Sequence, residues 1–160
     1  MDTLVSFGLR LLAMLPGVLQ RWYWTEERLS AAIEIDMRGT GEALKFNLSA
    51  PARVELWLKI TSMAPFDITI DRLKIELWSN GYIGEIWGLE KHTLQPRKSK
   101  DIFIKNCQCF NSGEGSGLDQ EHVNCELQVG GYFISKVRQF TKSPVTLSMV
   151  HGKVINRGHR

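Results

Sequence analysis

The 160-residue chain lacks a strong excess of either charge. Twenty lysines and arginines stand against 17 acidic residues, and the formal net charge is only +3. A chain that binds the phosphates of DNA or RNA carries a stronger and more clustered positive charge, so we expect no nucleic-acid partner. The charged fraction of 23% and the hydrophobic fraction of 43% are typical of a globular domain. The length is sufficient for a hydrophobic core.

Cysteine is scarce, with Cys107, Cys109 and Cys125 the only three. An odd number leaves at least one thiol unpaired within a single chain, which favours a reducing compartment. Two alternatives stay open: a cross-strand disulfide beside the small-residue loop at 111–117, and a zinc site that includes His122. The C-x-C spacing departs from that of common zinc sites. We expect three free thiols that pack as small apolar groups, and no metal or other cofactor.

The chain also lacks the short motifs that mark catalytic sites. No G-x-S-x-G turn is present, and none of the four histidines belongs to an H-E-x-x-H motif. The glycines at 113–117 lack the lysine and the helix of a phosphate loop. Glu26 and Glu27 fall in a short polar segment, which gives no support to a glycosidase pair. These absences favour a protein that is not an enzyme.

Long apolar runs are missing as well. Residues 4–19 are the most apolar stretch, but a membrane-spanning helix needs about 20 apolar residues, and Arg10 and Pro16 interrupt this one. A secretory signal also fits poorly, because no basic start precedes Arg10 and no small-residue cleavage site follows. The aromatic residues that flank Arg21 resemble those that settle at a membrane–water boundary.

We therefore predict an apolar N-terminal helix and linker over residues 1–30. In one hypothesis this segment is an in-plane or re-entrant anchor that holds the protein on the cytoplasmic side of a membrane. In the other it packs on the rest of the protein or on another subunit. The side chains expected at the membrane are Leu4, Phe7, Leu11, Leu12, Leu15, Leu19, Arg21, Trp22, Tyr23 and Trp24.

What the chain has in abundance is period-two alternation, and the stretch 53–78 shows it best. Even positions from 54 to 60 are apolar, which is typical of a strand with one buried face. Pro65 interrupts the pattern because it has no backbone N–H. Even positions are again apolar at 66–70, but odd positions take over at 73–77. This one-residue shift predicts a β-bulge, a bend, or a strand that crosses between sheets.

Similar alternation predicts further strands. Those at 33–37 and 44–48 flank a glycine turn and are expected to form a hairpin. The glycines within 82–89 suggest bulges or an edge position, and Gly130-Gly131 is expected to end a strand that begins near 123. With no helix after residue 30, about seven to eight strands predict an all-β, immunoglobulin-like antiparallel sandwich over residues 31–160. The predicted core includes Leu56, Leu58, Ile60, Ile68, Ile75, Leu127 and Leu147.

This order of elements resembles the late embryogenesis abundant group 2 domain, also called the water stress and hypersensitive response domain. The likeness covers roughly residues 53–155 and rests on five segments: Val54–Ile60, Pro65–Leu77, Asn80-Gly81, Leu94–Pro96 and Ile102–Ile104. The resemblance implies an immunoglobulin-like sandwich without a catalytic site, and a role in stress response. One departure is that the family usually has an asparagine near the end of the first of these strands, where this chain has Thr61–Pro65.

Two tryptophans and a basic segment are candidates for a partner surface. Trp57 and Trp78 fall opposite the apolar positions of their strands and are expected to face outward, unless residues 20–24 cover Trp57. Lys91, Arg97, Lys98 and Lys100 form a basic stretch that is either solvated or in contact with anionic headgroups. The sequence thus predicts a non-enzymatic binding or protective module at a membrane surface. The alternative is a soluble module that binds an apolar ligand or a partner protein, with the N-terminal helix as its lid or dimer contact. The oligomeric state stays open.

Overall fold

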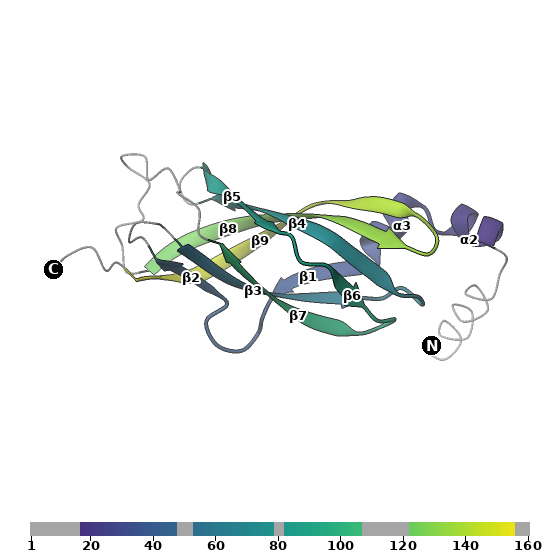
Figure 1. Ribbon diagram of the computed structural model, residues 1–160. Coiled ribbons are helices and arrows are strands. Elements are labelled where there is room, and N and C mark those ends of the chain that lie inside the picture. The colour runs from purple at the N-terminus through teal and green to yellow at the C-terminus, as the bar shows by residue number, and fades with distance from the viewer. Residues whose placement is uncertain (1–16, 48–52, 79–81, 107–121, 156–160) are drawn as a thin grey trace.

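The computed structural model describes residues 17–47, 53–78, 82–106 and 122–155, and it shows an all-β sandwich preceded by two short helices (Figure 1). The helices are α2 (Gly17–Tyr23) and α3 (Glu26–Ala31). The described part of the chain contains nine strands: β1 (Ile33–Met37), β2 (Leu44–Asn47), β3 (Arg53–Ser62), β4 (Ile68–Trp78), β5 (Tyr82–Gly88), β6 (His92–Leu94), β7 (Ser99–Asn106), β8 (His122–Ser135) and β9 (Gln139–Ile155).

The strands form two layers that join along one side of the sandwich. In one layer β3 lies between β7 and the pair β1 and β2. In the other layer β9, β8 and β4 follow one another, and β5 and β6 both pair with β4. A short parallel pairing of β2 with β9 connects the layers. On the opposite side, β5 and β7 are edge strands with no further partner among the described residues.

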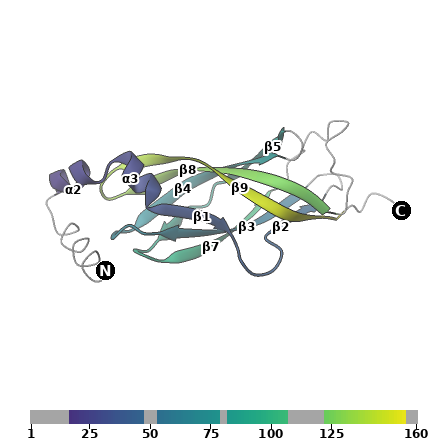
Figure 2. The ribbon, with the colours of Figure 1, turned by 180° about the vertical axis from the view of Figure 1, so that it is seen from behind.

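The predicted hairpin between the first two strands is wrong. Both β1 and β2 pair antiparallel with β3, β1 along residues 58–62 and β2 along residues 53–56. The two strands therefore run in the same direction along β3, and residues 38–43 leave the sheet between them (Figure 2). The long alternating run of β3 offers one continuous edge, and two short strands share it.

The shift of apolar residues in β4 is a β-bulge, one of the three predicted explanations. The register between β4 and β8 shifts between Ile70 and Arg72. On either side of the bulge the apolar side chains point into the same core, since Ile70 and Leu73 are both buried. One extra residue thus keeps both halves of the strand facing inward.

The expected break at Gly130-Gly131 is also wrong, because β8 runs through both glycines to Ser135. The strand bulges there, with a register shift between Val129 and Gly131 against β9. A Cβ on Gly131 would lie only 2.5 Å from the ring of Phe133. The glycine therefore makes room for a core aromatic ring and does not end the strand.

The core confirms most of the predicted buried residues. Six of the seven are fully buried, and only Leu147 is partly exposed. The same core also includes Trp24 and Leu29 from the helical segment, so that packing crosses the predicted boundary at residue 30. That division of the chain stays a prediction.

A buried lysine closes the gap between α3, β1 and β9. The Lys142 ammonium group donates a hydrogen bond to the Ile33 carbonyl, on the edge of β1. Burial lowers the pKa of Lys142, while Glu34 and Asp36 act in the opposite direction. The lysine thus provides a donor where the edge of β1 would otherwise leave a buried carbonyl without one.

Candidate functional site: an apolar helix face at one end of the sandwich

Helix α2 lies at one end of the molecule and is fixed to it by reciprocal hydrogen bonds (Figure 1). Arg21 Nε donates to the Val137 carbonyl at 3.0 Å, and Arg138 donates to the Arg21 carbonyl at 2.7 Å. Both partners belong to the tight turn between β8 and β9. The Ser135 hydroxyl holds that turn by accepting from the backbone N–H groups of Val137 and Arg138. The helix is therefore attached to a well-defined part of the sandwich.

Aromatic packing fixes the residues that follow α2. Trp24 is only 6% exposed and meets Phe66 edge-to-face, with ring centroids 5.3 Å apart. Tyr23 packs edge-on against Trp24 and carries the Arg28 guanidinium over its ring at 4.5 Å. Thr25 then caps α3 by accepting a hydrogen bond from the Arg28 N–H. Residues 23–28 thus connect α2 to α3 and attach this connection to the core through Trp24.

The remaining side of α2 is apolar and exposed. Val18 is 79% exposed, Leu19 46% and Trp22 81%. Leu19 and Trp22 are three residues apart and Val18 and Trp22 four, so that the three side chains lie on one face of the helix. An isolated exposed apolar residue is ordinary, but a cluster of three on one helix face is a candidate interaction surface.

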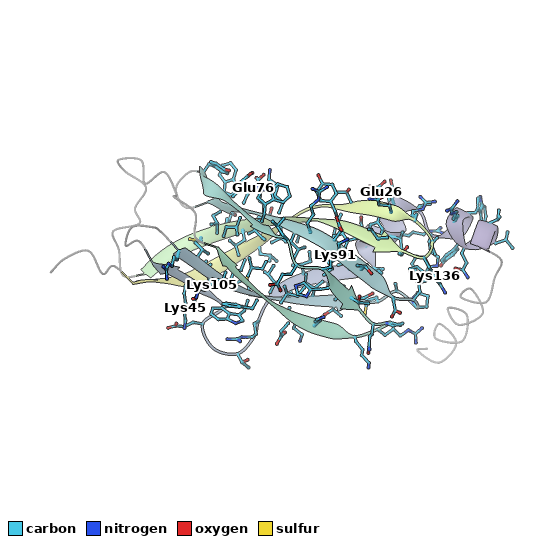
Figure 3. All side chains as sticks on the ribbon, viewed as in Figure 1. Glu26, Lys45, Glu76, Lys91, Lys105 and Lys136 are labelled. Carbon is cyan, nitrogen blue, oxygen red and sulfur yellow. The ribbon has the colours of Figure 1, made fainter. Side chains whose placement is uncertain are left out.

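Basic residues lie at the same end of the molecule. Lys136 is exposed next to α2 (Figure 3), and its ammonium group lies 5.7 Å from the Phe66 ring centroid. Lys136 and Pro96 line one shallow cleft, which brings Arg97 and Lys98 to this end as well. Asp67 lines the cleft too. This end therefore combines an apolar helix face with exposed cations and with the exposed acids Asp67, Glu26 and Glu27.

The structure separates the residues predicted at the membrane. Leu19 and Trp22 are exposed, Tyr23 is half-buried and Arg21 is bonded to the sandwich. Trp24 is a core residue, so its predicted membrane contact does not fit its position in this fold. Leu4, Phe7, Leu11, Leu12 and Leu15 lie outside the described residues. In the described part of the chain, no helix combines the length and apolarity that crossing a bilayer requires.

The structure does not bring the predicted partner-surface residues together. Trp57 faces outward as expected, stacks on Phe103 with centroids 4.6 Å apart, and has Arg38 and Lys45 over its ring. Trp24, one of the residues considered as a cover for Trp57, packs on Phe66 instead. Trp78 faces outward from the other layer, against Tyr82. The two tryptophans therefore lie on opposite faces of the sandwich.

The predicted basic stretch is also divided. Lys91 binds Asp71 at 2.9 Å beside β4, whereas Arg97 and Lys98 form the turn before β7 and Lys100 lies within that strand. Arg97 has a positive φ of 55°, the left-handed conformation that a tight turn requires. All four side chains are exposed, and their role at a partner surface stays a prediction.

Of the three cysteines, only Cys125 lies in the described part of the chain. Its thiol is free and buried, and burial raises its pKa to about 11. The thiol therefore stays protonated at neutral pH and packs as a small apolar group. Cys107, Cys109 and His122, whose side chain is not described, give no test of the disulfide or zinc alternatives. Over the described residues, no three metal-binding side chains come together.

Comparisons with known proteins find similar folds among solved structures, all at low sequence identity. No protein-family model and no curated protein matches the chain. Among solved structures, the structural genomics target SoR45 has a TM-score of 0.49 at 10% identity, over 72% of this chain and 83% of that one. A protein from Archaeoglobus fulgidus has a TM-score of 0.39 at 9% identity, over 73% of this chain and 94% of that one. A putative ApaA protein from Bordetella pertussis has a TM-score of 0.38 at 6% identity, over 79% of this chain and 92% of that one. Similarity at this level carries no inference about function.

Proposed function

We propose that this protein is a non-enzymatic binding module that docks on the surface of an anionic membrane through α2. The observation that carries the proposal is the exposed cluster of Val18, Leu19 and Trp22 on a helix whose other side is fixed to the sandwich. Such a face inserts into the interfacial region without any rearrangement of the fold. Tryptophan is among the residues most enriched at that depth.

Charge supports an anionic surface as the partner. Lys136, Arg97 and Lys98 are exposed at the same end of the molecule as α2. Each cation near an anionic leaflet contributes about 1 kcal/mol of attraction, which salt weakens. The sandwich would be a stiff scaffold that orients these groups, and the location would be the cytoplasmic side of the membrane. Membership of the late embryogenesis abundant group 2 family and a protective role in stress are part of this proposal, supported by the strand pattern at 53–78.

The test is binding of the full chain to vesicles, with a matched pair of substitutions. Val18→Asp and Leu89→Asp place the same charge at two exposed apolar positions, of which only Val18 lies on α2. Flotation with phosphatidylcholine vesicles that contain phosphatidylserine should recover the wild type and Leu89→Asp. Val18→Asp should bind at least roughly tenfold more weakly, because the burial of one aliphatic side chain is worth that factor or more.

The controls separate the two hypotheses about the helix. Binding should weaken in pure phosphatidylcholine and at high salt if the cations contribute. Equal binding of the two variants would contradict docking through α2. If the wild type ignores vesicles but forms a dimer that Val18→Asp dissociates, the apolar face is a protein contact and the soluble binding module is the better explanation.

A further inference from the structure

The sandwich has a hollow on its open side, at the point where the chain leaves β4 between strands β5 and β6. β5 pairs with β4 up to Gly88 opposite Leu73, and β6 resumes the pairing at His92 opposite Ile70. Residues 89–91 leave the sheet between these points, across from the bulge in β4. The ion pair of Lys91 with Asp71 holds this detour in place. Without a strand to cover them, core residues border a hollow of about 80 Å³.

The hollow is lined by residues of both layers, and its deepest residues are apolar. Leu73 belongs to β4 and Ile104 to β7, and both are buried core residues. A Cβ on Gly88 would lie 3.2 Å from Ile104 Cδ1, so a side chain at this position would crowd the wall. At the rim, Leu89 is 71% exposed and Phe103 45%. An apolar group bound here would therefore cover mainly Leu89 and Phe103, whose surface the chain itself leaves open.

The rim also carries polar groups of both signs, and burial lowers the pKa of His92, which favours its neutral form. His92 and Lys105 line the hollow, and Lys100 is close enough to affect the histidine. Two acids oppose them: Glu55 binds Lys105 at 3.2 Å, and Glu90 Oε2 lies 4.0 Å from His92 Nε2. The Glu90 side chain is 86% exposed and therefore loosely held. A carboxylate of the chain itself thus lies near the histidine edge without a close hydrogen bond to it.

We infer that this hollow binds an aliphatic carboxylate. The alkyl chain packs between the exposed side chains of Leu89 and Phe103, with its end in the hollow over Leu73 and Ile104. The carboxylate takes the place of Glu90 beside His92 and reaches Lys105. Small-molecule sites commonly combine such apolar walls with a few polar groups that fix orientation. This site is separate from the apolar face of α2, so it stands or falls independently of membrane docking.

Titration calorimetry of the full chain with sodium octanoate tests the inference. We expect one saturable site with a dissociation constant below the order of 10 mM, which even a modest ligand efficiency gives for a ligand of this size. Lys105→Gln and His92→Gln should each weaken binding roughly tenfold, because each removes a partner of a charged group. Glu90→Gln should strengthen binding, because it removes the internal competitor. Lys59→Gln, an exposed substitution on the neighbouring strand β3, should leave binding unchanged.

Ligands with the same chain and another head group complete the test. Octylammonium should bind more weakly than octanoate, and 1-octanol should not distinguish Lys105→Gln from the wild type. The inference is overturned if the wild type shows no saturable binding, if octylammonium binds as tightly as octanoate, or if neither Lys105→Gln nor His92→Gln changes the affinity. A thermal melt of each variant establishes that it is folded, and because Lys105 and Glu90 are exposed, their replacements keep the core intact.

Discussion

At Gly131 the strand β8 has no room for a side chain. A Cβ there would lie 2.5 Å and 2.6 Å from two ring atoms of Phe133, and 3.0 Å from Leu73. The ring is fully buried and stacks on Phe140, so it cannot move aside without opening the core. We expect Gly131→Ala to destabilise the protein by about 1–3 kcal/mol through overpacking. The measurement is urea unfolding followed by tryptophan fluorescence.

The adjacent glycine is a matched control for this prediction. A Cβ on Gly130 would come no closer than 4.0 Å to any neighbour, and both such neighbours are backbone carbonyl oxygens. Gly130→Ala should therefore leave the urea midpoint of unfolding nearly unchanged or raise it slightly, since alanine restricts the conformations of the unfolded chain. If both variants unfold at the same urea concentration, steric crowding by Phe133 is not the reason that position 131 requires glycine.

At the scale of the element, the segment that includes α2 has one side packed on the core and one side exposed, and each side carries a tryptophan. Trp24 is in the core against Phe66, whereas Trp22 is 81% exposed. Trp24→Ala should lower the free energy of unfolding by about 3–5 kcal/mol, as expected for truncation of a large buried aromatic residue. Trp22→Ala should leave stability almost unchanged and should reduce vesicle binding. Thermal melts of both variants make the comparison, and a loss of stability on Trp22→Ala equal to that of Trp24→Ala would contradict it.

This packing also changes what a truncation is expected to do. From sequence alone, residues 1–24 look like a removable anchor, because they are apolar and precede the first alternating strand. In the structure, removal of these residues would take Trp24 out of the core and Arg21 away from Val137. Deletion of residues 1–24 should therefore lower the melting temperature even if the membrane proposal is right.

Elements also show what a sequence pattern predicts and what it does not. Alternation is a local property, so it identified β3, β4 and their buried faces, and the phase shift near Asp71 located the bulge. Strand pairing is non-local, so nothing in the pattern showed that β1 and β2 share one edge of β3. The exposed face of α2 was predicted in part, but Trp24 was not distinguished from Trp22 because a short helix end has no clear periodicity. The hollow beside His92 depends on a three-residue detour that no sequence rule indicated.

At the scale of the whole molecule, the two sides of the sandwich differ in how they are closed. The pairing of β2 with β9 joins the layers on one side, and β5 and β7 leave the other side open. Edge strands open locally at a lower free energy than central strands. Hydrogen exchange should therefore be slow for paired amides in the centre of β4 and β8, and much faster for the outward amides of β5 and β7. Equal protection of β5 and β4 would mean that something covers the open edge, such as a second copy of the chain.

The pairing of β2 with β9 has a consequence for how the protein is made. Lys45 lies opposite Lys153, so a strand from the first third of the chain completes its hydrogen bonds with almost the last residues of the described chain. A ribosome releases β2 long before β9, and during that interval the edge of β2 has no partner. Unpaired edges in nascent chains are sites of misassembly. A cell that slows translation between β2 and β9 prolongs that exposure, and its chaperones have that interval in which to act.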